Sequence, residues 1–185
     1  MRVTPEHARA LNAPLASARL ALEPLTAAHA EALFTPLQHA AIYAWISSQP
    51  PSTVAALRER WAGLEGRLSP DGEEAWLNWA VRRAGDGAFV GRVDVSVSVG
   101  DVATNVGYVL FPAHWGAGYA TEAVRAVVAH LEGCGVRELR ATVTVGNEAS
   151  CRVLERCGFR RTGVLRGNDT IRGALVDDVA FVRGG

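Results

Sequence analysis

Apolar and polar residues alternate most clearly between positions 75 and 99. From 93 to 99, valines fill every second position and Asp94, Ser96 and Ser98 stand between them, which is typical of a half-buried strand. The segment 75–83 has a similar alternation, and the turn Ala84-Gly85-Asp86-Gly87 between the two favours a hairpin. Further strands are predicted at 19–25, 105–111, 139–145, 159–165 and 175–182.

Helical patterns separate several of these strands. Between 116 and 137, apolar residues recur at spacings of three and four, at positions Ala123, Val124, Val127, Val128 and Leu131. Thr26 is predicted to cap a helix that runs to about 33, and Ser52 or Thr53 one that runs to about 64. A further helix is predicted from Asn147 to Cys157. The aromatic segment 40–47 is either a second helix or a loop that lines a pocket.

This order of elements predicts an α/β fold on a mixed sheet of six to seven strands, flanked by helices. Hairpins give antiparallel neighbours, whereas the helical crossover makes strands 105–111 and 139–145 parallel. The chain has no visible linker or internal repeat. We therefore expect a single domain over 1–185, with 1–16 as an N-terminal extension and 17–183 as the core.

A loop of small residues joins strand 105–111 to the helix that follows it. The loop contains Trp115-Gly116-Ala117-Gly118, and Tyr119, Ala120 and Thr121 open the helix. The first amides of a helix have no intrahelical acceptor, and glycine lets the backbone approach a ligand closely. This stretch therefore predicts a site for a phosphorylated cofactor.

Two nucleotide-binding motifs do not fit this loop. A Walker loop needs a lysine after its glycines, and the chain contains no lysine. The dinucleotide motif needs a third glycine, but position 121 is threonine. Glu138 precedes or begins a strand, whereas that motif's acidic residue follows one.

The loop resembles motif A of the GNAT superfamily of N-acetyltransferases, written Q/R-x-x-G-x-G/A, with Trp115 in place of the leading residue. A second block, NEASCRVLERCGF over 147–159, is similar to the N-x-x-S-x-x-V-L-E-x-x-G-F of the ribosomal-protein N-terminal acetyltransferase branch. Arg19-Leu20-Ala21-Leu22 resembles that branch's first strand. The resemblance covers about 17–183. It implies the GNAT fold, in which the two parallel strands splay apart and acetyl-CoA lies between them as co-substrate.

The resemblance also assigns residues to the cofactor. Asn147 would bind the pantetheine arm, and Ser150 would protonate the leaving thiolate. The pyrophosphate would lie at the helix N-terminus, and a backbone amide near Val109 would polarise the thioester. The residues predicted to bind the cofactor are Val109, Leu110, Phe111, Trp115, Gly116, Ala117, Gly118, Tyr119, Ala120, Thr121, Asn147 and Ser150. Asn147 as a plain N-cap, and Ser150 as an ordinary first-turn residue, remain alternatives.

The general base is open. Relatives carry glutamate before the sequence IGY, but the corresponding residue here is Asn105, and an amide cannot accept the proton of an ammonium group. Asp94, on the polar face of its strand, is the best carboxylate replacement. Asp177, Asp178 or a chain of water molecules are alternatives. Tyr108 is a candidate acid, or a residue of the cleft wall.

Charge and cysteine content exclude other classes. The 185 residues include 19 basic and 19 acidic side chains, so the net charge is zero. This gives no electrostatic reason to expect nucleic acid or an anionic membrane as a partner. The three cysteines and scattered histidines have no metal-ligand spacing, and we expect neither a metal nor a disulfide framework. With no visible signal peptide, a cytoplasmic protein is expected.

The sequence thus predicts an acetyl-CoA-dependent N-acetyltransferase that acts by direct attack of a primary amine on the thioester. The acceptor is a protein or peptide N-terminus, or a small-molecule amine such as an antibiotic, polyamine or amino acid. A coenzyme A-binding module with little catalysis is the alternative that Asn105 favours. The protein is expected to be a monomer or a homodimer.

Overall fold

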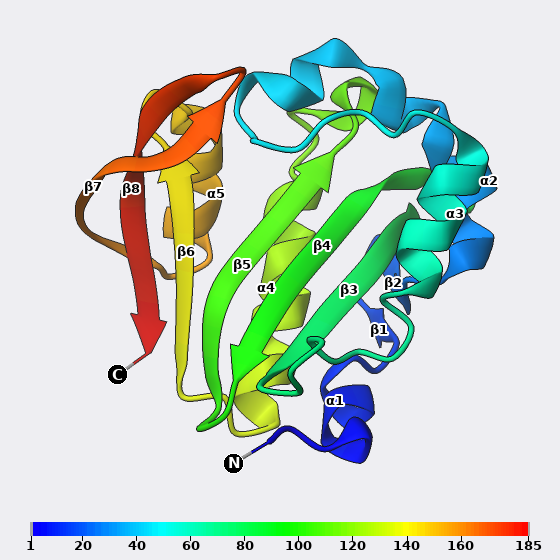
Figure 1. The fold of residues 1–185 in the computed structure, drawn as a ribbon, viewed down its shortest axis with the longest axis horizontal. Coiled ribbons are helices and arrows are strands. Elements are labelled where there is room, and N and C mark those ends of the chain that lie inside the picture. Colours follow the sequence, from blue (N-terminus) through cyan, green and yellow to red (C-terminus); the bar gives the residue numbers. More distant parts are fainter. Residues whose placement is uncertain (1, 185) are drawn as a thin grey trace.

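A single mixed sheet forms the centre of the structure, a computed structural model that describes residues 2–184 (Figure 1). Its spatial order is β1-β2-β3-β4-β5-β6-β8-β7. The strands are β1 (Leu15–Ala16), β2 (Leu20–Pro24), β3 (Glu74–Arg83), β4 (Phe89–Ser98), β5 (Val102–Leu110), β6 (Glu138–Thr144), β7 (Arg160–Ile171) and β8 (Ala174–Gly184). The helices are α1 (Pro5–Leu11), α2 (Ala30–Phe34), α3 (Val54–Ala62), α4 (Tyr119–Gly133) and α5 (Glu148–Arg156), with 3₁₀ turns η1 (Ala27–His29), η2 (Pro36–Gln38), η3 (Ala40–Ala44) and η4 (Pro112–His114).

The predicted parallel pair is confirmed, and it is short. β5 and β6 are paired only where Val102 meets Glu138 and Ala103 meets Leu139. Beyond these residues the two strands separate, so the second half of β5 has no strand on its β6 side. On their other sides, β5 pairs with β4 as far as Leu110, and β6 pairs with β8 as far as Thr144.

The face of the sheet behind the strands in Figure 1 packs against α4. The predicted apolar residues of this helix are all buried, and they belong to the same hydrophobic core as the valines of β4 at positions 93, 95 and 97. Leu154 and Cys151 of α5 join the same core. The alternation read from the sequence therefore places one face of β4 in this core and leaves Arg92, Asp94, Ser96 and Ser98 on the other face.

A second, smaller apolar cluster covers part of the opposite face. Leu33 of α2, Leu57 and Trp61 of α3, and Phe111 after β5 belong to it. The predicted cap of α3 is confirmed, because the Thr53 hydroxyl accepts a hydrogen bond from the Ala56 amide at 3.0 Å. The segment 40–47 contains η3 and belongs to this layer, and Ile42 is buried in it.

The sheet has eight strands in the described part of the chain, so the prediction of six to seven is wrong by one. The missed strand, β1, has two residues, too few to show an alternation. Helix α1 was not predicted either. It lies within the segment taken as an extension, and Ala8 and Leu11 bury their side chains in the main core. The predicted domain limits 1 and 185 lie outside the described residues.

No helix within residues 2–184 is long and apolar enough to cross a membrane. The longest of them, α4, has 15 residues.

Trp79 of β3 tests how the N-terminal segment is attached. Its side chain is fully buried, and its indole N–H donates to the Ala13 carbonyl at 2.8 Å. Trp79→Phe removes this donor and some volume, so we expect the free energy of unfolding to fall by about 1–3 kcal/mol in urea denaturation. Leu175→Ala is the control, because that side chain is exposed, and its effect is expected within about 0.5 kcal/mol. Equal stabilities of Trp79→Phe and wild type would contradict this account.

Candidate functional site

The loop after β5 adopts the conformation that its glycines allow. Gly116 and Gly118 have φ of 77° and 80°, a region that other residues rarely adopt. Gly118 is the N-cap of α4 and has no side chain that could cap the helix. The first hydrogen bond of the helix runs from the Glu122 amide to the Gly118 carbonyl at 3.1 Å. The amides of Tyr119, Ala120 and Thr121 therefore lack intrahelical acceptors, as an anion site requires.

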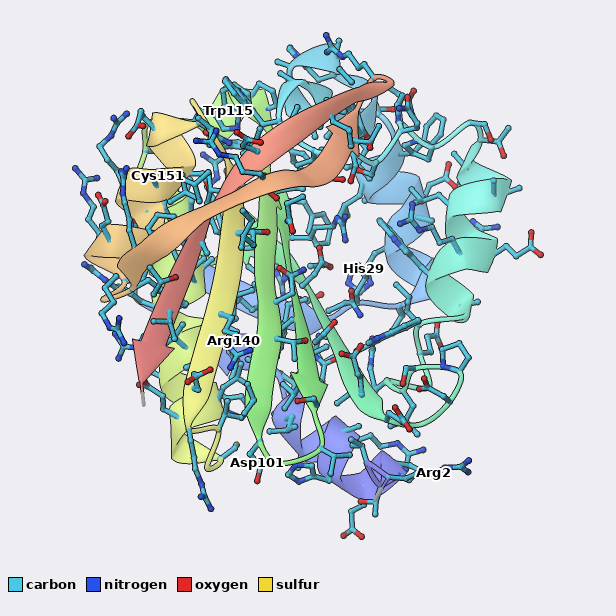
Figure 2. All side chains as sticks on the ribbon, turned by 60° about the vertical axis from the view of Figure 1, so that its left-hand side comes forward. Arg2, His29, Asp101, Trp115, Arg140 and Cys151 are labelled. Atoms are coloured by element: carbon cyan, nitrogen blue, oxygen red, sulfur yellow. The ribbon has the colours of Figure 1, made fainter. Side chains whose placement is uncertain are left out.

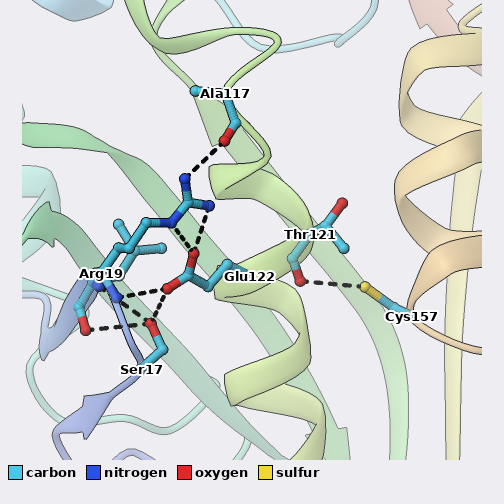
Figure 3. Close-up of polar contacts among 7 residues, drawn as sticks. Ser17, Arg19, Ala117, Thr121, Glu122 and Cys157 are labelled. Carbon is cyan, nitrogen blue, oxygen red and sulfur yellow. Dashed lines mark hydrogen bonds and ion pairs between the residues drawn. The ribbon is translucent and has the colours of Figure 1, made fainter.

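A cluster around Glu122 holds this loop against β2 (Figure 3). One Glu122 carboxylate oxygen accepts from the Ser17 hydroxyl at 2.7 Å and from the Arg19 amide at 2.8 Å. The other oxygen accepts from the Arg19 side chain at 2.6 Å. The same guanidinium donates to the Ala117 carbonyl at 3.1 Å and lies 4.6 Å from the centre of the Tyr119 ring.

This cluster neutralises an acidic group beside the predicted anion site. Burial alone raises the pKa of Glu122, but hydrogen bonds from Ser17 and Arg19 lower it overall, so the carboxylate stays ionised and paired. The sequence named Arg19 only as the start of a strand. Its partner is 103 residues away, and no local pattern could have joined the two.

A cavity of about 380 Å³ extends from this loop along the end of β5 that has separated from β6. It is lined by η3 from one face of the sheet and by α5 from the other. The predicted cofactor and acid residues that line it are Tyr108, Val109, Leu110, Trp115, Gly116, Gly118, Tyr119, Ala120, Thr121, Asn147 and Ser150. Ala41, Ile42, Trp45 and Ile46 complete the side formed by η3, which fits the pocket-lining alternative for segment 40–47.

Two predicted cofactor residues lie outside the lining. Phe111 is buried in the second apolar cluster, and its amide donates to the Val90 carbonyl of β4 at 2.9 Å. Ala117 is exposed in the loop and turns its carbonyl toward Arg19. Trp115 is 52% exposed. It lies at the end of the molecule where α5 begins, opposite the end that carries Arg2 and Asp101 (Figure 2).

The separated edge of β5 presents a short row of backbone groups to the cavity. Successive residues of a strand direct their amide and carbonyl groups to opposite edges. Phe111 bonds β4, and a side chain on Gly91 would collide with the Val109 carbonyl, so residues 109 and 111 face β4. Tyr108 and Leu110 therefore face the gap. The amide next to Val109 that faces the gap is that of Leu110, while the Leu110 carbonyl already accepts from the Trp115 indole at 2.7 Å.

Tyr108 and Ser150 meet inside the cavity. The Tyr108 hydroxyl oxygen lies 2.7 Å from the Ser150 hydroxyl oxygen and donates to the Ser150 carbonyl at 3.1 Å. Burial raises the pKa of Tyr108 far above its ordinary value, so the hydroxyl keeps its proton at neutral pH. The Asn147 side chain accepts from the Ser150 amide at 3.2 Å, so Asn147 caps α5 and lines the cavity as well.

The candidate bases lie elsewhere. Asp94 pairs with Arg92 at 2.6 Å, and burial raises the pKa of Asp94 although Arg92 acts to lower it. Asp177 pairs with Arg166 and accepts from the Gly167 amide at 2.8 Å. Asp178 is buried and accepts from the Asn168 side chain at 2.7 Å. None of these three lines the cavity, and its described lining residues include no Asp or Glu.

Two of the three cysteines have the positions of packing residues. Cys151 and Cys157 are buried with free thiols, and Cys134 is exposed. Burial raises the pKa of Cys157 to about 11, which leaves the thiol protonated and unreactive at neutral pH. Between residues 2 and 184, no group of three or more histidine, cysteine, aspartate or glutamate side chains is arranged to hold a metal.

Comparison with known proteins agrees with this architecture. Residues 19–160 match the family described as Acetyltransferase (GNAT) domain. Over 128 residues the chain is 34% identical to the Bacillus subtilis (strain 168) protein called probable N-acetyltransferase YjcK, covering 68% of this chain and 69% of that protein. The chain spans only 54% of another Bacillus subtilis relative. The protein belongs to the GNAT acetyltransferase family, because the family match covers most of its length.

Solved structures share the fold. Ribosomal-protein-S5-alanine acetyltransferase from Vibrio fischeri superposes with a TM-score of 0.80 at 17% identity, covering 93% of this chain and 96% of that one. Spermidine N-acetyltransferase from Vibrio cholerae, in complex with coenzyme A and spermine, superposes with a TM-score of 0.76 at 18% identity, covering 91% and 96%. At these identities the likeness concerns the fold.

Glu122→Gln tests the cluster that holds the loop. The pKa of Glu122 is lowered in the folded protein, so its contribution to stability is present above its ordinary pKa of 4.5 and is lost as the pH falls through the lowered value. At pH 7 we expect the free energy of unfolding of the variant to be lower than that of wild type by at least about 1 kcal/mol. The difference should shrink below pH 4.5, measured by urea denaturation across pH.

Glu31→Gln is the matched control. Glu31 also pairs with an arginine, but its side chain is 75% exposed, so we expect almost no change in stability. A difference between Glu122→Gln and wild type that stays constant from pH 7 to pH 3 would contradict the assigned role of this carboxylate.

Proposed function

We propose that the protein transfers the acetyl group of acetyl-CoA to a primary amine. The observation that carries this proposal is the cavity along the separated end of β5, which joins an open helix N-terminus to the Tyr108–Ser150 pair. The free amides of Tyr119, Ala120 and Thr121 suit the pyrophosphate. The free backbone groups of Tyr108 on the edge of β5 suit an amide of the pantetheine arm, which can bond to this edge as another strand would.

The reaction needs one polarising group and one proton donor. The Leu110 amide, which faces the gap without a strand partner, supports the thioester oxygen as negative charge develops on it. The amine nitrogen attacks the carbonyl carbon, the C–N bond forms, and the C–S bond breaks. The Tyr108 hydroxyl gives its proton to the leaving sulfur and recovers one through Ser150.

The amine must arrive without a proton or lose it at the site. No carboxylate is among the described lining residues, so the proton of the ammonium group leaves through water rather than to a carboxylate of the cavity wall. Asp94 forms an ion pair with Arg92 and does not line the cavity, and it is the carboxylate that remains as a candidate base.

The lining also bears on the acceptor. The cavity wall formed by Ile42, Trp45 and Ile46 is apolar, and a polyamine would leave its further ammonium groups without carboxylate partners there. This favours an acceptor with a single amine beside an uncharged group, such as the N-terminus of a protein or peptide. Small-molecule amines are the second candidate, because the chain shares its fold with the spermidine N-acetyltransferase from Vibrio cholerae.

Binding of acetyl-CoA is tested by thermal unfolding. A ligand that binds the folded state at 100 times its Kd stabilises it by about 2.7 kcal/mol, which raises the Tm by about 5–10 °C in a protein of this size. Gly118→Glu should abolish the shift, because it puts a negative charge at the loop and a side chain at a φ of 80°. Gly163→Glu adds the same charge at an open site and should keep the shift. A wild-type Tm unchanged by acetyl-CoA would refute the proposal.

Catalysis is tested by thiol release from acetyl-CoA with peptide N-termini and with spermidine. We expect Tyr108→Phe to lower kcat by about 100-fold because the proton donor is lost. Its Kd for acetyl-CoA should stay near the wild-type value. Ser150→Ala should have a smaller effect. Binding without thiol release from any amine would instead support a coenzyme A-binding module, and an unchanged kcat in Tyr108→Phe would remove that residue from the mechanism.

A further inference from the structure

Three arginines gather beside the loop, and the proposed chemistry does not use them. Arg152 and Arg156 lie one turn apart on α5 and line the cavity, and Arg125 is on α4. A second, open hollow of about 620 Å³ lies on the surface next to α4 and is lined by Arg125 and Arg156. The hollow and the cavity share Gly118, Thr121 and Arg156, so they are continuous at the N-terminus of α4.

The packing of α4 against α5 fixes this arrangement. The Cys157 thiol lies 3.5 Å from the Thr121 carbonyl, which holds the end of α5 against the first turn of α4 (Figure 3). The Arg125 guanidinium donates twice to the Arg156 carbonyl, at 3.2 and 2.7 Å, through Nε and one terminal nitrogen. Arg125 is thereby held next to Arg156, and its other terminal nitrogen makes no hydrogen bond within residues 2–184.

The positive charge of this cluster is not compensated. In the described part of the chain, none of the three arginines forms an ion pair. The acidic residues nearby are committed elsewhere, since Glu122 binds Arg19 and both Glu148 and Glu155 bind Arg161. Like charges held together without counter-charges are unfavourable unless an anion joins them. Guanidinium groups bind phosphate through paired, charge-assisted hydrogen bonds.

We propose that Arg125, Arg152 and Arg156 bind the 3′-phosphate of coenzyme A. The inference rests on the proposed function, in which the amides of the loop take the pyrophosphate. A phosphomonoester carries nearly two negative charges at pH 7, more than the amides at a helix N-terminus neutralise. The cluster lies where the cavity opens onto the surface, beyond the loop, so the ribose end of the cofactor reaches it. The site makes the protein selective for coenzyme A over dephospho-coenzyme A, which lacks only that phosphate.

The test is calorimetric titration with coenzyme A and with dephospho-coenzyme A. We expect wild type to bind coenzyme A at least about tenfold more tightly. Arg152→Gln and Arg156→Gln should each reduce this ratio, and the triple Arg→Gln variant should bring it to within about twofold, with the Kd for dephospho-coenzyme A unchanged. The side chains of Arg152 and Arg156 make no hydrogen bond inside the described structure, so the two single variants are expected to fold with the wild-type Tm, and the Tm of the triple variant, which also loses the Arg125 hydrogen bonds, is measured beside them.

Arg9→Gln is the matched control. It removes an exposed arginine on α1, at the other end of the molecule, and should keep the full ratio (Figure 1). Adenosine 3′,5′-bisphosphate should compete with coenzyme A in wild type and not in the triple variant, whereas inorganic phosphate at the same concentration should compete in neither. Strong competition by inorganic phosphate would overturn the assignment to the 3′-phosphate.

The outcomes separate this inference from the proposed function. Equal affinities for the two forms of coenzyme A in wild type, with acetyl transfer intact, would overturn the inference alone. Arginine variants that weaken both ligands equally would also overturn it. A retained tenfold ratio without acetyl transfer would support the arginine site and contradict the proposed function. Absence of binding by either ligand would overturn both.

Discussion

The separation of β5 from β6 is the constraint on which the rest of the site depends. The strands are bonded only at Val102–Glu138 and Ala103–Leu139, and each then follows its other neighbour, β4 or β8. A buried strand edge must satisfy its backbone groups. Here the cavity keeps them available to a ligand, and α4 and α5 fix its width by packing behind the two strands. The loop, the Tyr108–Ser150 pair and η3 are all arranged around this one interruption of the sheet.

Charge is distributed around the cavity in a consistent way. The carboxylates closest to the loop are paired, Glu122 with Arg19 and the two glutamates of α5 with Arg161. Arg125, Arg152 and Arg156 form no ion pair in the described part of the chain. A chain with zero net charge can therefore present a positive region where an anionic ligand would lie. This shows why net charge alone describes such a protein poorly.

The sequence predicted what is local and periodic. Strands such as 89–99 and helix α4 follow from spacing, and the loop glycines from the need for a close backbone approach. It could not predict contacts that the fold creates. Arg19 meets Glu122 across 103 residues, and Tyr108 meets Ser150 across 42. Strand β1 was too short to show a period. The sequence also could not show which edge of β5 the Phe111 amide faces, because a shift of one residue along a strand turns the amide to the opposite edge.

The Trp115 side chain blocks the last carbonyl on the unpaired edge of β5. An unpaired strand edge can bond to any extended chain, including another copy of the protein, and proteins commonly block such edges. The indole occupies the Leu110 carbonyl, so an intruding strand would find a donor at Leu110 but no acceptor beyond Tyr108. A ligand needing only two or three hydrogen bonds fits this short segment, whereas a β-strand needs a longer row. The same side chain that borders the cavity thus limits the row of free backbone groups along the interrupted edge of the sheet.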